Sequence, residues 1–392
     1  MRSASEIVFW VAAGLIVWTQ LAYACSLWLL ARLSPRARKH RGGWARDAGP
    51  HELPSVSLII AAHNEQEVIE AKVENALALD YPRERLELIV ACDGCTDATA
   101  ERASAAGAEI VLELERGGKV RAQDAAVERS HASIVAFSDA NALWEKDALR
   151  LLLDAFADPR VGYACGQVRY LEASEDDGAT SQEGLYWRYE LGVRDLESRL
   201  RSITAGNGAI YATRRESYLV VDPVMGHDLS FPFNMVKRHW RAVYVPSALA
   251  RERMVPSIEG EFARKRRMMS HTWPIVVRGG MLSPRGYGVA YALMIFSHRL
   301  LRYATPALHV IALVANLIAV ADGAGLVLRI TLWLQGALIV AAVLAGFRPF
   351  RRVRILLVAR HYVLSTAAVA AGLWDWLRHG TSASWQAAEG TR

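Results

Sequence analysis

Polar residues that could bind a nucleotide follow two short apolar runs of the sequence. The run 56–62 leads into Asn64 and Glu65, and the run 86–91 leads into Asp93, which a glycine follows. A carboxylate at the end of a strand, beside a tight glycine turn, can accept hydrogen bonds from a base or a ribose. The polar residues after Asp93 could equally cap the next helix, which would leave Asp93 to face a ligand.

Two later segments have the residue types that bind phosphate and metal. A glycine pair precedes Lys119, and glycine lets the backbone approach a phosphate while lysine supplies positive charge. Asp139 and Asn141 follow another apolar run, and their oxygens could jointly hold Mg²⁺ or Mn²⁺ at the diphosphate of a bound nucleotide. An ordinary loop around Lys119 and a turn built from Asp139 and Asn141 are the alternative interpretations.

Charged residues later in the chain indicate a proton acceptor and an anion site. Asp228 precedes the helical stretch 229–238, and a carboxylate there could remove a proton from a hydroxyl group. Arg264 and Arg267 belong to a run of four basic residues that could neutralise a diphosphate. Such a run beside a membrane could instead carry lipid-facing charge.

The segment that holds most of these residues alternates short apolar runs with helical patterns. The expected elements are strands 56–62, 86–91, 109–114 and 133–138 and helices 65–79, 98–106 and 120–129. This alternation predicts an α/β fold with right-handed crossovers and a mostly parallel sheet. Because ligands bind where the strands of such sheets end, the polar residues are expected at one edge.

The composition predicts a soluble domain joined to membrane-spanning helices. Hydrophobic residues make up 52% of the 392-residue chain, too many for an ordinary soluble enzyme, whereas 22% charged residues are too many for a chain lying wholly in lipid. Apolar stretches long enough to span a membrane occupy residues 7–33, 303–321, 324–347 and 355–376. The expected divisions are an N-terminal transmembrane anchor (1–33), a basic linker (34–53), a cytoplasmic catalytic domain (54–260), an amphipathic interface segment (261–302), about three transmembrane helices (303–377) and a tail (378–392).

The formal net charge of +6 reflects arginine clusters beside the apolar stretches. Basic residues follow the first stretch and fill the loop 348–354, which favours membrane lipids over nucleic acid as a partner. If all four stretches span the membrane, both clusters lie on the same side, and the positive-inside rule makes that side the cytoplasm. The chain is therefore expected to be integral to a bacterial-type inner or plasma membrane, with its catalytic domain in the cytoplasm.

Taken in order, these segments resemble the membrane-bound branch of glycosyltransferase family 2, which contains cellulose synthase-like and hyaluronan synthase-like enzymes. The resemblance runs from about residue 54 to residue 267. Its motifs are Ala61-Ala62-His63-Asn64-Glu65, Asp93-Gly94-Cys95-Thr96-Asp97, Gly117-Gly118-Lys119, Asp139-Ala140-Asn141 and Glu261–Met268. It implies a GT-A type nucleotide-binding domain, which takes a nucleotide-sugar donor together with a divalent metal ion.

The resemblance assigns donor and acceptor roles to residues of this chain. It implies that Asp93 holds the nucleoside, that Asn64 and Glu65 shape the same pocket, and that Lys119 lies close by. The residues expected to line the acceptor side are Tyr186, Trp187 and Glu190.

The resemblance also implies which residues carry the chemistry. Asp139 becomes the firm ligand of Mn²⁺ or Mg²⁺, and Asn141 the weaker one. Asp228 inherits the role of the catalytic base. Arg264 and Arg267 become candidates for binding the diphosphate.

Three departures from the family pattern bear on the activity. Asn141 replaces an acidic residue of the segment Asp139-Ala140-Asn141, which we call the metal motif. His227 replaces the glutamate that usually precedes the base. Arg264 and Met268 stand where processive synthases commonly have Gln and Trp in a Q-x-x-R-W motif. Because that tryptophan would stack on a growing sugar chain, its loss favours transfer of one or a few sugars.

The sequence thus predicts a membrane-anchored, inverting glycosyltransferase. It would move a sugar, expected from the resemblance to come from a UDP-sugar, to a hydroxyl group of a lipid-linked or polysaccharide acceptor. A nucleotidyltransferase shares this type of sheet, but the glycine-rich loop with arginine after its first strand is missing here. Asn141 and His227 leave open a second interpretation, a catalytically inactive membrane scaffold that retains the fold.

Overall fold

The strands of the chain form one mixed sheet whose first half is parallel. The computed structural model describes residues 3–34, 49, 52–171, 178–253, 258–350 and 353–381, and the side chains of 170–186, 253–261 and 348 lie outside this description. The predicted linker and tail therefore fall largely outside it, as does the side chain of Tyr186. The strands are β1 (Val56–Ala62), β2 (Leu86–Asp93), β3 (Ile110–Leu114), β4 (Ile134–Asp139), β5 (Leu143–Trp144), β6 (Val161–Leu171), β7 (Ile210–Arg214) and β8 (Arg241–Arg253).

The strand order explains where the site forms. Within the described residues it is β3-β2-β1-β4-β7-β6-β8-β5, with β1 to β4 mutually parallel and β7 antiparallel to β4. The predicted strands agree with the first four to within about two residues, and the predicted mostly parallel sheet is confirmed. Because β2 and β4 flank β1 and run the same way, Asp93 and Asp139, their last residues, reach the same sheet edge.

Helices cover both faces of the sheet, so its central strands are apolar on both sides. Every residue of β1 is buried, as expected for a parallel strand between two helical layers. Leu58 and Ile60 pack with α4, α5 and α7, whereas Ile59 packs with α6 and α9. These helices are α4 (Ile69–Leu77), α5 (Thr99–Ala105), α6 (Lys119–Arg129), α7 (Ala148–Asp154) and α9 (His227–Lys237).

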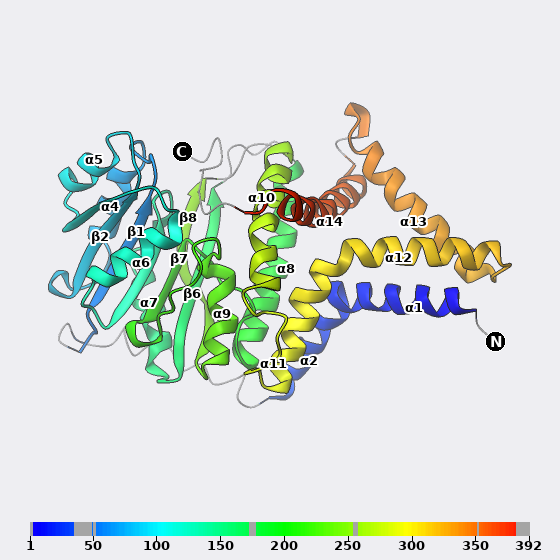
Figure 1. Cartoon of the computed structure of the whole chain (residues 1–392), viewed down its shortest axis with the longest axis horizontal. Helices are drawn as coiled ribbons and strands as arrows, with labels where there is room; N and C mark the ends of the chain where they lie inside the picture. The colour runs from blue at the N-terminus through cyan, green and yellow to red at the C-terminus, as the bar shows by residue number, and fades with distance from the viewer. Residues whose placement is uncertain are drawn as a thin grey trace.

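Two further helices lie between the sheet and the apolar end of the molecule (Figure 1). They are α8 (Gly178–Leu200) and α10 (Ile258–Val277). Val193 of α8 and Ile275 of α10 share one core with Phe233 of α9 and Tyr291 of the membrane-side helices. Short 3-10 turns complete the described chain: η3 (Arg83–Arg85), η4 (Ala155–Ala157), η5 (Arg215–Ser217) and η7 (Arg348–Phe350).

Among the described residues, four helices are long and apolar enough to cross a membrane: Ala4–Leu33, Val289–Ala321, Leu326–Leu344 and Arg354–His379. The first helix consists of α1 (Ala4–Val17), the π-helical η1 (Trp18–Ala22) and α2 (Tyr23–Leu33). The second consists of α11 (Val289–Met294), the π-helical η6 (Ile295–Leu300) and α12 (Leu301–Ala321). The third and fourth are α13 (Leu326–Leu344) and α14 (Arg354–His379). The second helix begins at Val289, well before the apolar stretch at 303–321 that the sequence shows. Large apolar side chains such as Trp333, Leu334 and Val310 are exposed on these helices, which suits contact with lipid.

The first two apolar helices lie side by side and meet where each has a π-helical turn (Figure 1). Trp18 Nε1 donates to Ser297 Oγ at 2.9 Å, and Thr19 Oγ1 donates to the Ser297 carbonyl at 2.7 Å. Thr19 is fully buried. A π-helical turn displaces backbone groups from the regular helix ladder, and here a side chain from the neighbouring helix satisfies such a carbonyl.

Candidate active site

Asn64 connects the ends of the first two strands. It is one of two residues other than glycine with a positive φ in the described chain, at 51°, a conformation that asparagine tolerates better than most residues. Its Oδ1 accepts a hydrogen bond from the backbone N–H of Thr96 at 2.8 Å. Glu65 is buried, and its backbone N–H donates to Thr99 Oγ1 at 2.8 Å. Asn64 and Glu65 therefore shape the loop after Asp93, beside the predicted nucleoside pocket.

Asp93 holds the glycine pair in place. Its carboxylate is 1% exposed and accepts from the backbone N–H groups of Gly117 at 2.6 Å and Gly118 at 3.0 Å. Gly118 has a φ of 95°, which favours glycine, whereas a methyl group on Gly117 would meet only the flexible Arg121 side chain. The Asp93 carboxylate thus fixes the loop that begins α6, while its predicted contact with a nucleoside stays a prediction.

A cleft of about 390 Å³ opens beside Asp93, between β3 and α6. Leu114 and Ala122 provide apolar walls, and Asp124 provides a carboxylate. Burial raises the pKa of Asp124 to about 6, although Tyr218 donates a hydrogen bond to it at 2.6 Å. The volume is within the range of small-ligand pockets, roughly 300–1,000 Å³.

Lys119 and Asp139 join the glycine loop to the predicted metal motif. Lys119 is the first residue of α6, and its Nζ forms an ion pair with Asp139 Oδ1 and donates to the Gly208 carbonyl at 3.3 Å. The Asp139 side chain is 22% exposed, so a ligand can reach it. In the described part of the chain no three His, Cys, Asp or Glu side chains gather as a metal site. The candidate ligand set therefore combines carboxylate with the amide of Asn141.

Asp228 lies close to this pair although it is remote in sequence. It is in the first turn of α9, and its backbone carbonyl accepts from the Gly206 N–H at 2.6 Å. A methyl group placed on Gly208 would lie 3.6 Å from Lys119 Nζ and 3.7 Å from Asp228 Cβ. Lys119, Asp139 and Asp228 therefore converge around Gly208, as the sequence interpretation requires of a metal motif and a base.

His227, by contrast, belongs to the core rather than to the site. Its side chain is 3% exposed, hydrogen bonds Tyr211 through Nδ1 at 2.7 Å, and stacks on Phe231 with ring centroids 4.0 Å apart. Burial lowers its pKa to about 3, so the ring is neutral at neutral pH. The residue that replaces the family's glutamate thus contributes packing beneath Asp228.

The four basic side chains of α10, residues 264–267, lie on two faces of the helix. Lys265 donates to Ser365 Oγ at 3.1 Å, and Arg266 binds both carboxylate oxygens of Asp375 at 2.6 Å, so these two attach α10 to α14. Arg264 and Arg267 are three residues apart and therefore share a different face of the helix. Arg264 is near enough to the Glu252 carboxylate to lower its pKa, which places this face toward the metal motif.

Glu252 is a residue of this region that the sequence analysis missed. It lies in β8, and its Oε1 is buried without a hydrogen-bond partner among the described residues. Burial and the negative charge of Asp139 together raise its pKa to about 7, although Lys119 and Arg264 act in the opposite direction. The available signal was a carboxylate near the end of an apolar run, the same placement as Asp139.

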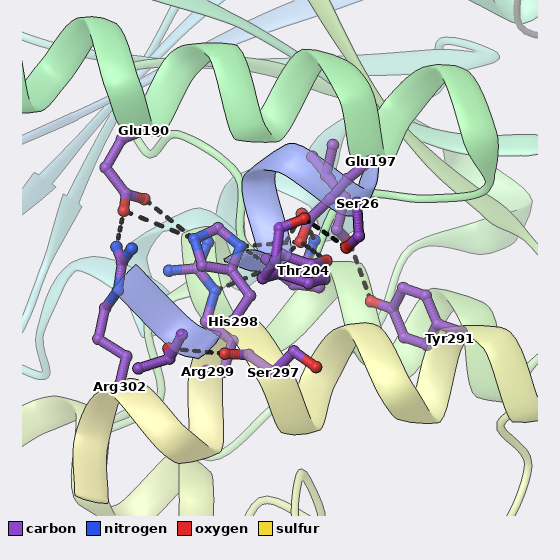
Figure 2. A network of polar contacts seen from close by, with 12 residues as sticks. Ser26, Glu190, Glu197, Thr204, Tyr291, Ser297, His298, Arg299 and Arg302 are labelled. Atoms are coloured by element: carbon purple, nitrogen blue, oxygen red, sulfur yellow. Dashed lines mark hydrogen bonds and ion pairs between the residues drawn. The ribbon is translucent and has the colours of Figure 1, made fainter. Parts of the chain in front are cut away.

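A buried charged cluster connects the catalytic side of the chain to the apolar helices (Figure 2). Glu197 is fully buried and accepts from Tyr23 Oη at 2.8 Å and from the Thr204 N–H at 3.0 Å, and it pairs with His298 Nδ1 at 2.8 Å. Burial alone would raise the pKa of Glu197, but His298 and Arg299 hold it below its ordinary value. We call this cluster the junction network; its members are Tyr23, Glu190, Glu197, Thr204, His298, Arg299 and Arg302.

The junction network contains one residue that was predicted to line the acceptor side, and it touches the site at one point. Glu190 binds Arg302 and His298 (Figure 2), and its acceptor role stays a prediction. Arg299 Nε donates to Thr204 Oγ1 at 2.9 Å. Thr204 lies two residues before Gly206, whose N–H holds the backbone of Asp228. The network therefore ties the segment that positions Asp228 to the apolar helices.

Sequence relatives share parts of this chain. A family model described as "Glycosyltransferase like family 2" matches residues 54–270, more than half of the chain. An N-acetylglucosaminyltransferase from Neorhizobium galegae is 26% identical over 249 residues, which are 58% of this chain and 57% of that protein. A beta-monoglucosyldiacylglycerol synthase from Synechocystis sp. is 32% identical over 174 residues, which are 43% of this chain and 36% of that protein. The chain thus matches less than two thirds of the length of either relative.

A solved structure resembles almost the whole fold. The mannosyltransferase PcManGT from Pyrobaculum calidifontis, in complex with GDP-Man and Mn²⁺, aligns with a TM-score of 0.67 over 95% of this chain and 99% of that chain, at 21% identity. This likeness confirms the predicted GT-A type fold. The narrower resemblance to cellulose synthase-like and hyaluronan synthase-like enzymes stays a prediction.

Proposed function

The chain belongs to glycosyltransferase family 2, and we propose that it transfers a sugar from a nucleotide-sugar donor to an acceptor hydroxyl group at a membrane. The observation that carries this proposal is the convergence of Lys119, Asp139 and Asp228 around Gly208. Displacement of a diphosphate needs positive charge and a proton acceptor. Lys119 provides a cation, Asp139 a carboxylate that can bind a metal ion, and Asp228 a carboxylate that can accept a proton.

The donor would lie along the edge formed by the glycine loop and the metal motif. Asp93, Asn64 and Glu65 would shape the nucleoside pocket, and Lys119 would contact the diphosphate from the positive end of α6. UDP is the proposed nucleotide from the family resemblance alone. The solved mannosyltransferase carries GDP-Man, so a guanosine donor is the first alternative to test.

A divalent cation, Mn²⁺ or Mg²⁺, fits the residues present at the metal motif. The Asp139 carboxylate is partly exposed, and the Asn141 side chain makes no hydrogen bond within the described chain, so both can offer oxygen ligands. The solved mannosyltransferase contains Mn²⁺. When bound, such an ion would offset the negative charge that develops on the diphosphate.

We propose a single displacement with inversion at the anomeric carbon. The Asp228 carboxylate takes the proton of the acceptor hydroxyl while that oxygen forms a bond to the anomeric carbon. The bond from the anomeric carbon to the diphosphate oxygen breaks, and the nucleoside diphosphate leaves with the electron pair. Lys119, Arg264 and Arg267 balance its charge. No covalent intermediate with the protein is needed.

The acceptor is proposed to be lipid-linked or a saccharide at the membrane surface. Four helices long and apolar enough to cross a membrane adjoin the catalytic side, and the Synechocystis relative is named for a diacylglycerol glycolipid. The positive-inside rule favours an integral membrane protein with a cytoplasmic site. Met268, where a processive synthase commonly has tryptophan, favours transfer of one or a few sugars.

The test is release of nucleoside diphosphate from a panel of UDP- and GDP-sugars by the full chain in detergent. The assay includes Mn²⁺ or Mg²⁺ and a membrane lipid extract as acceptor. We expect turnover of one donor, and loss of that turnover in both Asp139→Ala and Asp228→Ala. Arg160→Gln, which breaks an exposed ion pair with Asp158, serves as a control that keeps turnover.

Silence of the wild-type chain across the whole panel would contradict the proposal. If the silent protein is folded, the second interpretation, a catalytically inactive membrane scaffold, would be favoured. Turnover that persists in Asp139→Ala and Asp228→Ala would contradict the assigned residues while leaving the family in place.

A further inference from the structure

Glu252 lies beside the metal motif because of the way β5 pairs with β8. The pairs of this antiparallel ladder are Trp144 with Ala250 and Leu143 with Arg251. The next step of the same register sets Glu252 opposite Ala142, three residues after Asp139. A short strand directly after the metal motif thus brings it to a carboxylate more than a hundred residues later.

The Glu252 carboxylate is incompletely satisfied where it lies. Its Oε1 is buried and has no hydrogen-bond partner in the part of the chain that the structure describes. A buried carboxylate oxygen without a partner is costly, and native structures usually provide one. The nearby negative charge of Asp139 adds repulsion, which a cation between the two carboxylates would relieve.

Lys72 is a third protein cation that acts on Glu252, after Lys119 and Arg264, and its hydrogen bond is made elsewhere. Its side chain is fully buried, and its Nζ donates to the Ala142 carbonyl at 2.6 Å, over the ring of Trp144. No ion pair between Lys72 and Glu252 forms within the described chain, although the two charges interact. Lys72 therefore supports the turn after the metal motif, and Glu252 Oε1 is left to another partner.

We propose that Glu252 is a second carboxylate ligand of the divalent cation at Asp139, and that it supplies the negative charge that Asn141 lacks. This inference rests on the proposed function. Asp139, Asn141 and Glu252 then offer three oxygen donors with two negative charges, a set that suits Mn²⁺ and Mg²⁺. The acidic group of the family motif is not lost from this chain but moved to the neighbouring strand.

The test measures Mn²⁺ affinity rather than turnover. Electron paramagnetic resonance of free Mn²⁺ gives the dissociation constant for the full chain in detergent, with UDP and in parallel with GDP. We expect Glu252→Gln to weaken Mn²⁺ binding by about tenfold or more, as loss of a metal-binding partner does. In the double variant Glu252→Gln with Asn141→Asp, the acid returns to its usual motif position, and Mn²⁺ affinity should recover to within a few-fold of wild type.

A matched control separates this effect from general charge removal. Glu145 follows β5 directly and pairs with Arg251 at the surface, so Glu145→Gln removes a carboxylate from the same region without touching the metal motif. It should leave the Mn²⁺ affinity unchanged. Glu252→Asp keeps the charge and withdraws it by one methylene; it should bind Mn²⁺ with reduced affinity, and it serves if the glutamine variant does not fold.

Wild-type Mn²⁺ affinity in a folded Glu252→Gln or Glu252→Asp chain would overturn the inference. So would weakened binding that Asn141→Asp fails to restore, because Glu252 would then act through the turn at Ala142 and not as a ligand. Mn²⁺ binding that depends on Glu252 in a chain without turnover would uphold the inference while contradicting the proposed function. The two failures are therefore distinguishable.

Discussion

Two regions of this chain gather charged residues, and they differ in how completely their buried carboxylates are paired. In the junction network both oxygens of Glu197 accept hydrogen bonds, and Thr204 both donates to Glu197 and accepts from Arg299. At the sheet edge, Glu252 has a buried oxygen without a partner among the described residues, and Asn141 forms no hydrogen bond there. Paired buried carboxylates hold the fold together, whereas a carboxylate oxygen left without a partner at the site is available to a ligand.

Neutralising the junction network should produce the largest loss of stability. Glu197→Gln leaves His298 and Arg299 without their buried carboxylate, and breaking such a buried cluster costs on the order of 3 kcal/mol or more. We expect a clearly lower midpoint of thermal unfolding for the detergent-purified chain.

Asp195 provides the matched control for this prediction. It lies on α8, as Glu197 does, and forms an ion pair with Arg199 in which both side chains are about one-third exposed. Asp195→Asn should therefore lower the free energy of unfolding by at most about 1 kcal/mol. Equal unfolding midpoints for the Glu197 and Asp195 variants would break the contrast between the two regions.

Asp93→Asn should act on donor binding through the glycine loop. The carboxylate accepts from both Gly117 and Gly118, and such charge-assisted hydrogen bonds are worth roughly 1.5–3 kcal/mol. We expect the dissociation constant for the nucleoside diphosphate, measured by calorimetry, to rise by about ten- to a hundredfold. Glu101→Gln, a change at an exposed carboxylate of α5 that does not line the cleft, should leave it unchanged. Similar effects of both variants would argue against a specific role for Asp93.

His227 predicts how stability depends on pH. Its pKa is lowered to about 3 in the fold, so below its ordinary value near 6.5 the unfolded chain binds a proton that the folded chain does not. The contribution of His227 to the free energy of unfolding is therefore complete above about pH 6.5. It is lost progressively toward pH 3, by about 2 kcal/mol at pH 5. His227→Asn should lessen the fall in unfolding midpoint between about pH 7.5 and pH 5. The exposed His131→Asn should keep the wild-type fall, and the same slope in all three chains would refute this assignment.

The basic run of α10 offers a comparison within four residues. Arg264→Gln should raise the KM for the donor and lower kcat, because its face of α10 is directed toward the metal motif. Arg266→Gln removes the same charge but breaks only the ion pair with Asp375, so it should leave both constants nearly unchanged and cost at most about 1 kcal/mol of stability. Steady-state kinetics of the two variants check this prediction. If both variants lost activity alike, the assignment of Arg264 and Arg266 to different faces of α10 would be wrong.

The local pattern was sufficient to predict the four parallel strands β1 to β4 and the strand ends at which Asp93 and Asp139 lie. The apolar runs at β1, β2 and β4 are short, continuous and followed by polar residues, so their ends and the residues Asp93 and Asp139 could be placed from sequence. Asp228 was proposed as a proton acceptor from the sequence alone, and its role as the catalytic base comes from the family resemblance. Its convergence with Lys119 depends on the packing of α6, α9 and the segment around Gly208.

The features that sequence reasoning missed all depend on contacts between distant segments. Glu252 reaches the metal motif only through the pairing of β5 with β8. His227 is polar in sequence but is buried against Phe231. The apolar stretch in the sequence begins at residue 303, whereas the helix begins at Val289 and contains His298 and Arg299 in its first part. Both are buried and bonded to Glu197 and Thr204, contacts from a distant segment that lower the cost of placing them in an apolar helix.

We propose that sugar transfer takes place at this sheet edge and that Asp228 is the catalytic base. A comparison of Asp228→Asn with wild type for turnover, donor dissociation constant and unfolding midpoint, in one detergent preparation, tests this role. We expect a loss of turnover of about a hundredfold to ten-thousandfold, with donor affinity and unfolding midpoint nearly unchanged. Wild-type turnover in a folded Asp228→Asn chain would show that Asp228 is not the base.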